Sequence, residues 1–240
     1  MVFETQSAFL LKVIVIFAFL AAFFGLWVIN ALFRNRLKEL FSDAQFFIFF
    51  FMVFGYSLYA LGEVTWFLIY ELFELYSLSG MADFYWVIGS LLMLIPLTAL
   101  SRRLYRTYSS FQKAIPLLLS GAVLLFLIFF YVSAMGGSAI EYYYAVSNSL
   151  LLLASAPLLL FFWQLKAAQL FEANLVYLFF GNMGFFIAEL LYIYITPREI
   201  YGSLGVLADS MYALGYFLSA FAFMMLLIKF YSSSRKQAVA

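Results

Sequence analysis

The sequence predicts an integral membrane protein folded as an all-α bundle of seven transmembrane helices. Of its 240 residues, 67% are hydrophobic and 10% are charged, whereas a soluble domain is about 45–50% apolar and about 25% charged. A helix needs about 20 mostly apolar residues to cross a bilayer, and seven stretches are long enough. They are apolar on all sides rather than alternating in polarity, which favours helices over a transmembrane β-barrel. The predicted spans are residues 8–33, 45–70, 81–101, 115–135, 142–165, 173–196 and 204–230.

The connections between these spans predict the domain organisation and the orientation. The first span, 8–33, is too long for a signal-peptide core and follows no basic segment, so we expect no cleaved signal peptide. No connection is long enough for a soluble domain, so residues 1–240 are expected to form a single membrane domain. Lys and Arg gather on the cytoplasmic side of membrane proteins, and only Lys12 and Arg198 lie on the other side here. We therefore expect the N-terminus outside and the C-terminus in the cytoplasm. The cytoplasmic basic residues are Arg34, Arg36, Lys38, Arg102, Arg103, Arg106, Lys113, Lys166, Lys229, Arg235 and Lys236.

An internal repeat at an offset of 126 positions predicts a duplication. It sets the second and third spans against the sixth and seventh. By extension, residues 8–101 form repeat one, the span 115–135 is a linker helix, and residues 140–230 form repeat two. An even number of helices separates equivalent spans, so this 3+1+3 plan is parallel, and transporters with such repeats bind substrate at the repeat interface. The matched pairs are Gly55 and Gly181, Tyr59 and Phe185, Glu63 and Glu189, Trp66 and Tyr192, Ser77-Leu78 and Ser203-Leu204, Ala82-Asp83 and Ala208-Asp209, Trp86 and Tyr212, and Gly89 and Gly215.

Four acids on repeated positions are the candidate functional groups, and all four are expected in the outer half of the membrane. Tyr and Trp recur beside them at spacings that share a helical face. Their hydroxyl and indole groups donate hydrogen bonds to carboxylates while their rings pack against apolar neighbours. The candidate ligand-binding or cation-binding residues are Tyr59, Glu63, Trp66, Asp83, Trp86, Glu189, Tyr192, Asp209 and Tyr212.

A carboxylate inside a bilayer costs several kcal/mol unless it is neutralised or paired. No Lys or Arg lies at a depth that matches Glu63 or Glu189. Each Glu is therefore protonated, or accepts hydrogen bonds from Tyr, Trp or the backbone, or holds a cation or a cationic ligand. A purely structural hydrogen bond between helices is an equal alternative for both. For Asp83 and Asp209 the favoured interpretation is a helix N-terminal device, because a carboxylate in a first turn meets free N–H groups.

The residue types that are absent exclude several classes of protein. With no Cys and no His, the chain lacks thiolates, a His general base and the usual ligands for zinc and haem. A retinal Schiff base needs a buried Lys, and the last span has only Lys229, at its end. We expect no enzyme activity and no cofactor, and a site for Ca²⁺ or Mg²⁺ made of acids alone stays open. The net charge of +1 offers no field that would attract a nucleic acid.

The acidic segments carry a resemblance to a known family. The segments Gly62-Glu63-Val64-Thr65-Trp66 and Ala82-Asp83-Phe84-Tyr85, with Gly89 beyond, resemble the multi-helix membrane sensory regions at the N-termini of archaeal and bacterial histidine kinases and diguanylate cyclases. The segment from Ala208-Asp209 to Gly215-Tyr216 is also similar to those regions. Their Pro-Ser pair is replaced here by Ser79-Gly80 and by Gly205-Val206, and no kinase or cyclase domain follows Lys229. The resemblance implies a free-standing sensory unit that signals through a partner.

The functional hypothesis is a sensory, receptor-like or scaffold unit in the cell membrane, with an outward-facing site between the repeats. One alternative is a small transporter or channel for cations or protons that uses Glu63 and Glu189. Another is a structural subunit of a membrane complex. The expected partners are the lipid bilayer, a small ligand or cation, and a protein in the membrane or cytoplasm, but no nucleic acid.

Overall fold

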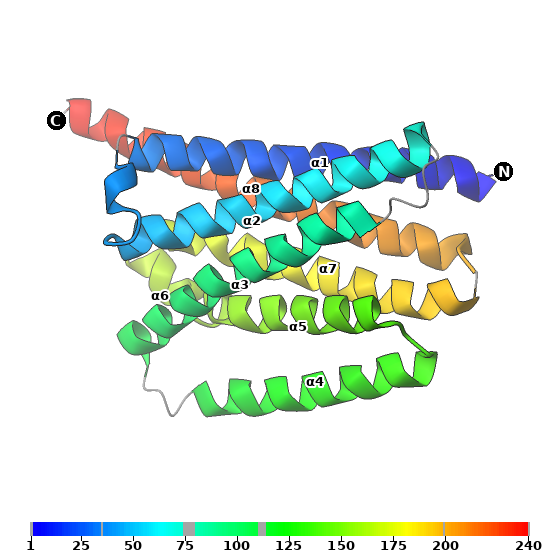
Figure 1. The fold of residues 1–240 in the computed structure, drawn as a ribbon. Helices are drawn as coiled ribbons and strands as arrows, with labels where there is room; N and C mark the ends of the chain where they lie inside the picture. Colours follow the sequence, from blue (N-terminus) through cyan, green and yellow to red (C-terminus); the bar gives the residue numbers. More distant parts are fainter. Residues whose placement is uncertain (1, 35, 74–79, 110–113, 199, 240) are drawn as a thin grey trace.

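A computed structural model describes residues 2–34, 36–73, 80–109, 114–198 and 200–239, and all regular structure in them is helical (Figure 1). In this described part, seven helices are long and apolar enough to cross a membrane. They indicate a multi-pass membrane protein. The long helices are α1 (Val2–Phe33), α2 (Ala44–Phe67), α3 (Gly80–Tyr108), α4 (Ile115–Met135), α5 (Ala139–Leu160), α7 (Val176–Ile195) and α8 (Gly202–Val239). The short ones are η1 (Leu37–Glu39), η2 (Leu68–Leu72), α6 (Phe162–Ala167), η5 (Phe171–Leu175) and η6 (Thr196–Arg198).

The seven predicted spans are confirmed, but several boundaries differ. The helix of the fifth span ends at Leu160 rather than at residue 165, and that of the seventh continues past residue 230 to Val239. Two other shifts have local causes. Helix α5 begins before residue 142 because Glu141 caps its first turn: the Ser138 N–H and Oγ both donate to Glu141 Oε2, over 2.6 and 2.8 Å. Helix α3 continues past residue 101 to Tyr108, because its helical hydrogen bonds need no apolar side chains once the chain leaves the hydrophobic stretch. Residues 77–79, named in the sequence patterns, lie outside the described residues.

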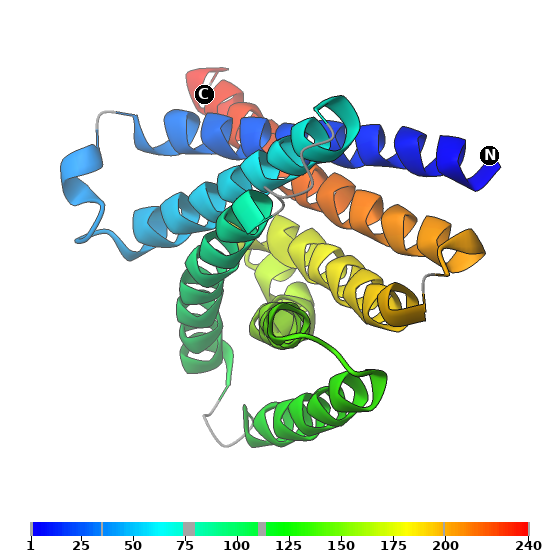
Figure 2. The ribbon, with the colours of Figure 1, turned by 45° about the vertical axis from the view of Figure 1, so that its right-hand side comes forward.

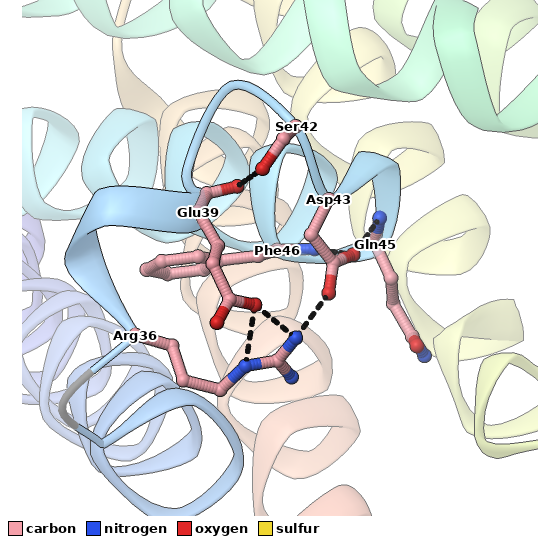
Figure 3. Close-up of polar contacts among 6 residues, drawn as sticks. All are labelled: Arg36, Glu39, Ser42, Asp43, Gln45 and Phe46. Carbon is pink, nitrogen blue, oxygen red and sulfur yellow. Dashed lines mark hydrogen bonds and ion pairs between the residues drawn. The ribbon is translucent and has the colours of Figure 1, made fainter.

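The start of α2 is fixed by an acidic cap (Figure 3). Asp43 Oδ1 accepts hydrogen bonds from the backbone N–H groups of Gln45 and Phe46, over 2.8 and 3.1 Å. The Arg36 guanidinium pairs with Asp43 at 3.0 Å and also with Glu39. The Phe46 N–H, with help from the Gln45 N–H and Arg36, lowers the pKa of the Asp43 carboxyl below its ordinary value, because each favours the charged form.

Six of the long helices form a closed ring, and α4 lies outside it. Going round the ring, α1 packs on α2, α2 on α3, α3 on α5, α5 on α7, α7 on α8, and α8 returns to α1. Helix α4 packs chiefly against α5, at the edge of the bundle in both views (Figures 1 and 2). In α4 only Gly121, Ile128 and Val132 are buried. The ring therefore encloses the core, while most of the surface of α4 lies outside it at the edge of the bundle.

Two helix pairs of the ring cross at glycines that admit no side chain. In the α2–α3 pair, a Cβ added to Gly55 would lie 2.8 Å from the carbonyl oxygen of Gly89. In the α7–α8 pair, a Cβ added to Gly181 would lie 2.9 Å from the carbonyl oxygen of Gly215. Such contacts let helix backbones approach closely, which is a common basis of helix association in membranes.

Candidate functional site

A cavity of about 680 Å³ lies among the ring helices. The α4–α5 and α7–α8 connections lie at the same end of the bundle (Figure 1), and residues of both line the cavity. At that end it is lined by Gly136 and Ser138 from one connection and by Thr196 and Pro197 from the other. The structure brings all the candidate residues of the sequence analysis together in this one cavity. They are Tyr59, Glu63 and Trp66 of α2, Asp83 and Trp86 of α3, Glu189 and Tyr192 of α7, and Asp209 and Tyr212 of α8.

The two glutamates are buried and each accepts a hydrogen bond from a tyrosine of α8. Glu63 is 7% exposed and Glu189 is 5% exposed. The Tyr216 hydroxyl donates to Glu63 Oε1 over 2.7 Å, and the Tyr212 hydroxyl donates to Glu189 Oε2 over 2.8 Å. Among the described residues, no phenol donates to the second oxygen of either carboxylate.

The two aspartates are also bound by phenols. Asp83 lies in the first turn of α3, as expected, but its Oδ1 accepts a hydrogen bond from Tyr144 of α5 over 2.6 Å. The interpretation of Asp209 as a helix N-terminal device is wrong, because α8 begins at Gly202 and has no acid in its first turn. Both oxygens of Asp209 instead accept hydrogen bonds, one from Tyr192 and one from Tyr201.

Aromatic rings form much of the remaining wall. The rings of Trp66 and Trp86 lie 5.8 Å apart with an interplanar angle of 44°. The equivalent rings of Tyr192 and Tyr212 have the same separation and angle. Tyr144 packs edge-on against Trp86, with 6.2 Å between ring centroids. The negative faces of such rings attract cations.

The charges that face the cavity have one sign. None of the described residues that line it is Lys or Arg, whereas Glu141 adds a further acid at the rim. The acids are spread round the wall: no group of three or more that could hold a metal ion occurs among the described residues. The Trp86 Nε1 is buried. Among the described residues it makes no hydrogen bond of normal geometry, although it approaches Glu63. The site is thus rich in acceptors and ring faces.

Sequence reasoning missed three residues of the site that come from α5 or from the segment before α8. Tyr144 and Asn148 line the cavity from successive turns of α5, and their i, i+4 spacing was the available signal. Tyr201 precedes α8 and contacts Asp209. A loop tyrosine carries no periodic pattern, so nothing in the sequence distinguished it from the other tyrosines near helix ends.

Comparisons with protein-family models, with curated proteins and with solved structures found no significant match. The functional conclusion therefore depends on the geometry and chemistry of the cavity.

Proposed function

We propose that this chain is a receptor-like sensory unit of the cell membrane whose cavity binds a small organic cation from the outer side. The observation that carries the proposal is the convergence of four carboxylates and several aromatic rings in one cavity with no basic residue among its described lining. Uncompensated acids in a low-dielectric site attract positive charge. An ammonium group also gains from the ring faces, by up to about 2 kcal/mol where it is desolvated.

The arrangement of the acids favours an organic cation over a metal ion. A hard cation such as Ca²⁺ takes six to eight oxygen ligands at short distance, and no described cluster of acids suits one. An ammonium ligand needs only one or two acceptors together with apolar and aromatic contact. Glu63 and Glu189 offer the acceptors, and Trp66 and Trp86 offer the ring faces.

Signalling is supported by hydrogen bonds that join the two halves of the ring. The carboxylates of Glu63 and Asp83, on α2 and α3, are bound by the phenols of Tyr216 and Tyr144, on α8 and α5. A cation that engages these carboxylates changes the bonds between the halves. A ligand shifts a conformational equilibrium only by such a difference in interaction. The sequence resemblance to membrane sensory regions fits the same role, with a protein partner carrying the signal onward.

The duplication and the orientation belong to the proposal. The ring order α1–α2–α3 is followed by α5–α7–α8, and the glycine crossing of α2 with α3 recurs between α7 and α8. This supports a parallel 3+1+3 repeat with α4 as the linker. The end of the bundle that carries the cavity is then the outer end, because Arg102 and Arg106 lie towards the opposite end.

Binding is tested on the protein reconstituted in nanodiscs, with choline and its neutral isostere 3,3-dimethylbutanol as probes. Intrinsic tryptophan fluorescence is the readout, since Trp66 and Trp86 line the cavity. We expect choline, and not the isostere, to change the emission saturably. The double variant Glu63→Gln with Glu189→Gln is expected to weaken choline binding at least about tenfold, the effect of losing roughly 1.4 kcal/mol.

The matched control is Glu172→Gln, because Glu172 is a buried acid outside the cavity, paired with Arg103 at 3.7 Å. Equal binding of the neutral isostere, or no response to choline, to tetramethylammonium or to any primary amine, contradicts the cation proposal.

A transporter is the second candidate, favoured by the placement of Glu63 and Glu189 at equivalent positions of two helix pairs. It predicts flux of the bound cation into proteoliposomes driven by a cation or proton gradient, abolished in the double Gln variant. Binding without flux supports the receptor, and flux that depends on both glutamates contradicts it.

A further inference from the structure

A second hollow lies between α3, α4 and α5, at the opposite end of the bundle from the acidic cavity. It is a groove of about 900 Å³. Its walls are mainly aliphatic and include Leu94, Leu117, Leu125, Leu150 and Leu153. The groove exists because α4 touches the ring mainly through α5 and leaves a space in front of α3.

One end of the groove carries positive charge and hydroxyl groups. Arg102, Tyr105 and Arg106 line it from the extension of α3. Their i, i+3 and i+4 spacing puts them on one face of that helix. The neighbouring Arg103 does not line the groove and instead pairs with Glu172 at 3.7 Å. The groove is therefore amphipathic along its length, with a basic mouth and an apolar interior.

The polar groups at this mouth have unused hydrogen-bonding capacity. Tyr105 is 9% exposed, and within the described part of the chain its hydroxyl has no hydrogen-bond partner. In the same part, neither Arg102 nor Arg106 forms an ion pair with an acid. A buried hydroxyl without a partner is uncommon in native proteins, so a hydrogen-bond acceptor is expected close to it. An anionic acceptor at the mouth would satisfy all three groups.

We propose that this groove binds a membrane phospholipid with an anionic headgroup, independently of the acidic cavity. The phosphate lies between Arg102 and Arg106, whose planar guanidinium groups suit bidentate contact with phosphate oxygens. The Tyr105 hydroxyl donates to a further headgroup oxygen, and an acyl chain fills the leucine-lined interior. Basic pockets between transmembrane helices on the cytoplasmic side are known to hold such headgroups.

The lipid is favoured over a second protein chain by charge and by composition. A helix of a partner protein needs no anionic group at one end of the groove, whereas a phospholipid places its phosphate one chain length from its apolar end. In the groove, the two arginines lie at one end, where the phosphate would be, and the leucine-lined wall extends from there along the path of the acyl chain.

The test is native mass spectrometry of the full-length protein in detergent, titrated with phosphatidylglycerol or with phosphatidylcholine. We expect saturable retention of one phosphatidylglycerol and weaker retention of phosphatidylcholine. The double variant Arg102→Gln with Arg106→Gln should weaken phosphatidylglycerol binding by on the order of tenfold or more, given about 1 kcal/mol per basic residue near an anionic lipid surface. Tyr105→Phe removes only the hydroxyl, and we expect it to weaken binding by a smaller factor.

Two further variants keep the result interpretable. Arg103→Gln lies on the same helix outside the groove and is expected to bind the lipid normally. Ala122→Trp fills the groove from the exposed face of α4 and should block the acyl chain while the arginines stay in place. Three results overturn the proposal: equal retention of both lipids, unchanged binding in the double arginine variant, or inorganic phosphate competing fully with the lipid, which would make the mouth a site for soluble anions.

Discussion

The α2–α3 and α7–α8 pairs have the same backbone crossing but satisfy their carboxylates in different ways. In both pairs a glycine of the first helix faces a glycine of the second, at almost equal distances. In the α7–α8 pair, Tyr192 and Tyr212 donate to the acids Asp209 and Glu189 of the same pair. The acids of the α7–α8 pair therefore take these hydrogen bonds from tyrosines of the same two helices.

The α2–α3 pair has Trp66 and Trp86 at those two positions, and an indole has no hydroxyl. Its acids take their phenols from other helices of the ring, Asp83 from Tyr144 and Glu63 from Tyr216. The phenol hydrogen bonds of the α2–α3 acids therefore cross to other helices, whereas those of Tyr192 and Tyr212 stay within the α7–α8 pair. The packing is repeated, while the polar contacts make the two halves depend on each other.

The largest expected effect comes from breaking the shared crossing. Gly181→Val places a side chain 2.9 Å from the Gly215 carbonyl oxygen, so we expect overpacking to cost about 3 kcal/mol or more and to lower the thermal midpoint in detergent. Gly55→Val should cost a similar amount in the other pair. Gly80→Ala is the control, because a Cβ there meets nothing within 4 Å. A Gly181→Val variant as stable as Gly80→Ala contradicts the close crossing.

An intermediate effect is expected from removing single phenol hydroxyls. Tyr216→Phe removes the bond between pairs to Glu63, and Tyr212→Phe removes the bond within a pair to Glu189. Each should cost about 1 kcal/mol of stability, the usual range for a hydrogen bond between transmembrane helices. A double-mutant cycle of Tyr216→Phe with Glu63→Leu, read by chemical unfolding, should show coupling, while Tyr212→Phe with Glu63→Leu should be nearly additive, because Leu removes the acceptor oxygen. Additivity for the Tyr216 pair together with coupling for the Tyr212 pair would contradict the hydrogen bond from Tyr216 to Glu63.

The smallest effect concerns the helix starts, where the two pairs also differ. Helix α2 is capped by Asp43, whereas the residue before α7, Leu175, offers no side-chain cap. Asp43→Ala should cost about 1 kcal/mol at pH 7. Because the folded-state pKa of Asp43 is lowered, its contribution is present above the ordinary value of 3.8 and is lost as pH falls through the folded-state pKa.

Thermal unfolding at pH 7 and at about pH 3, a value below the ordinary Asp pKa of 3.8, checks this sign. The difference between the unmodified protein and Asp43→Ala should shrink at the lower pH. Asp43→Asn retains a capping oxygen without the charge, so its stability relative to the Ala variant should change little with pH. A gap of unchanged size at both pH values would mean that the carboxylate charge contributes nothing to the cap.

The sequence predicted the helices and the cavity lining better than the contacts between them. Long apolar runs leave little choice but a transmembrane helix, which is why all seven spans were found. The recurrence of Glu63 at Glu189 and of Asp83 at Asp209 marked the site, because acids inside a membrane are costly and rarely occur by chance. All the residues singled out on that basis line one cavity.

The donors to those acids were harder to predict, for a physical reason. Whether a phenol lies close to a given carboxylate depends on how two helices pack. The residue spacing along one helix does not predict how the neighbouring helix is rotated about its axis. Tyr216 shares a helical face with Tyr212, yet it donates to α2 rather than α7. The arginine-lined groove was missed because it depends on α4 standing away from α3, which no spacing within either helix encodes.

The ring is closed by α1 against α8, two helices from opposite ends of the chain. Since a protein is synthesised from its N-terminus, α1 cannot reach its neighbour α8 until the other ring helices, α2, α3, α5 and α7, have been made. The acidic cavity takes two of its walls from α7 and α8, so any nascent chain short of α8 carries Glu63 without the phenol that binds it. Closure of the ring and of the cavity wall therefore depends on α8, which follows the other five ring helices in chain order.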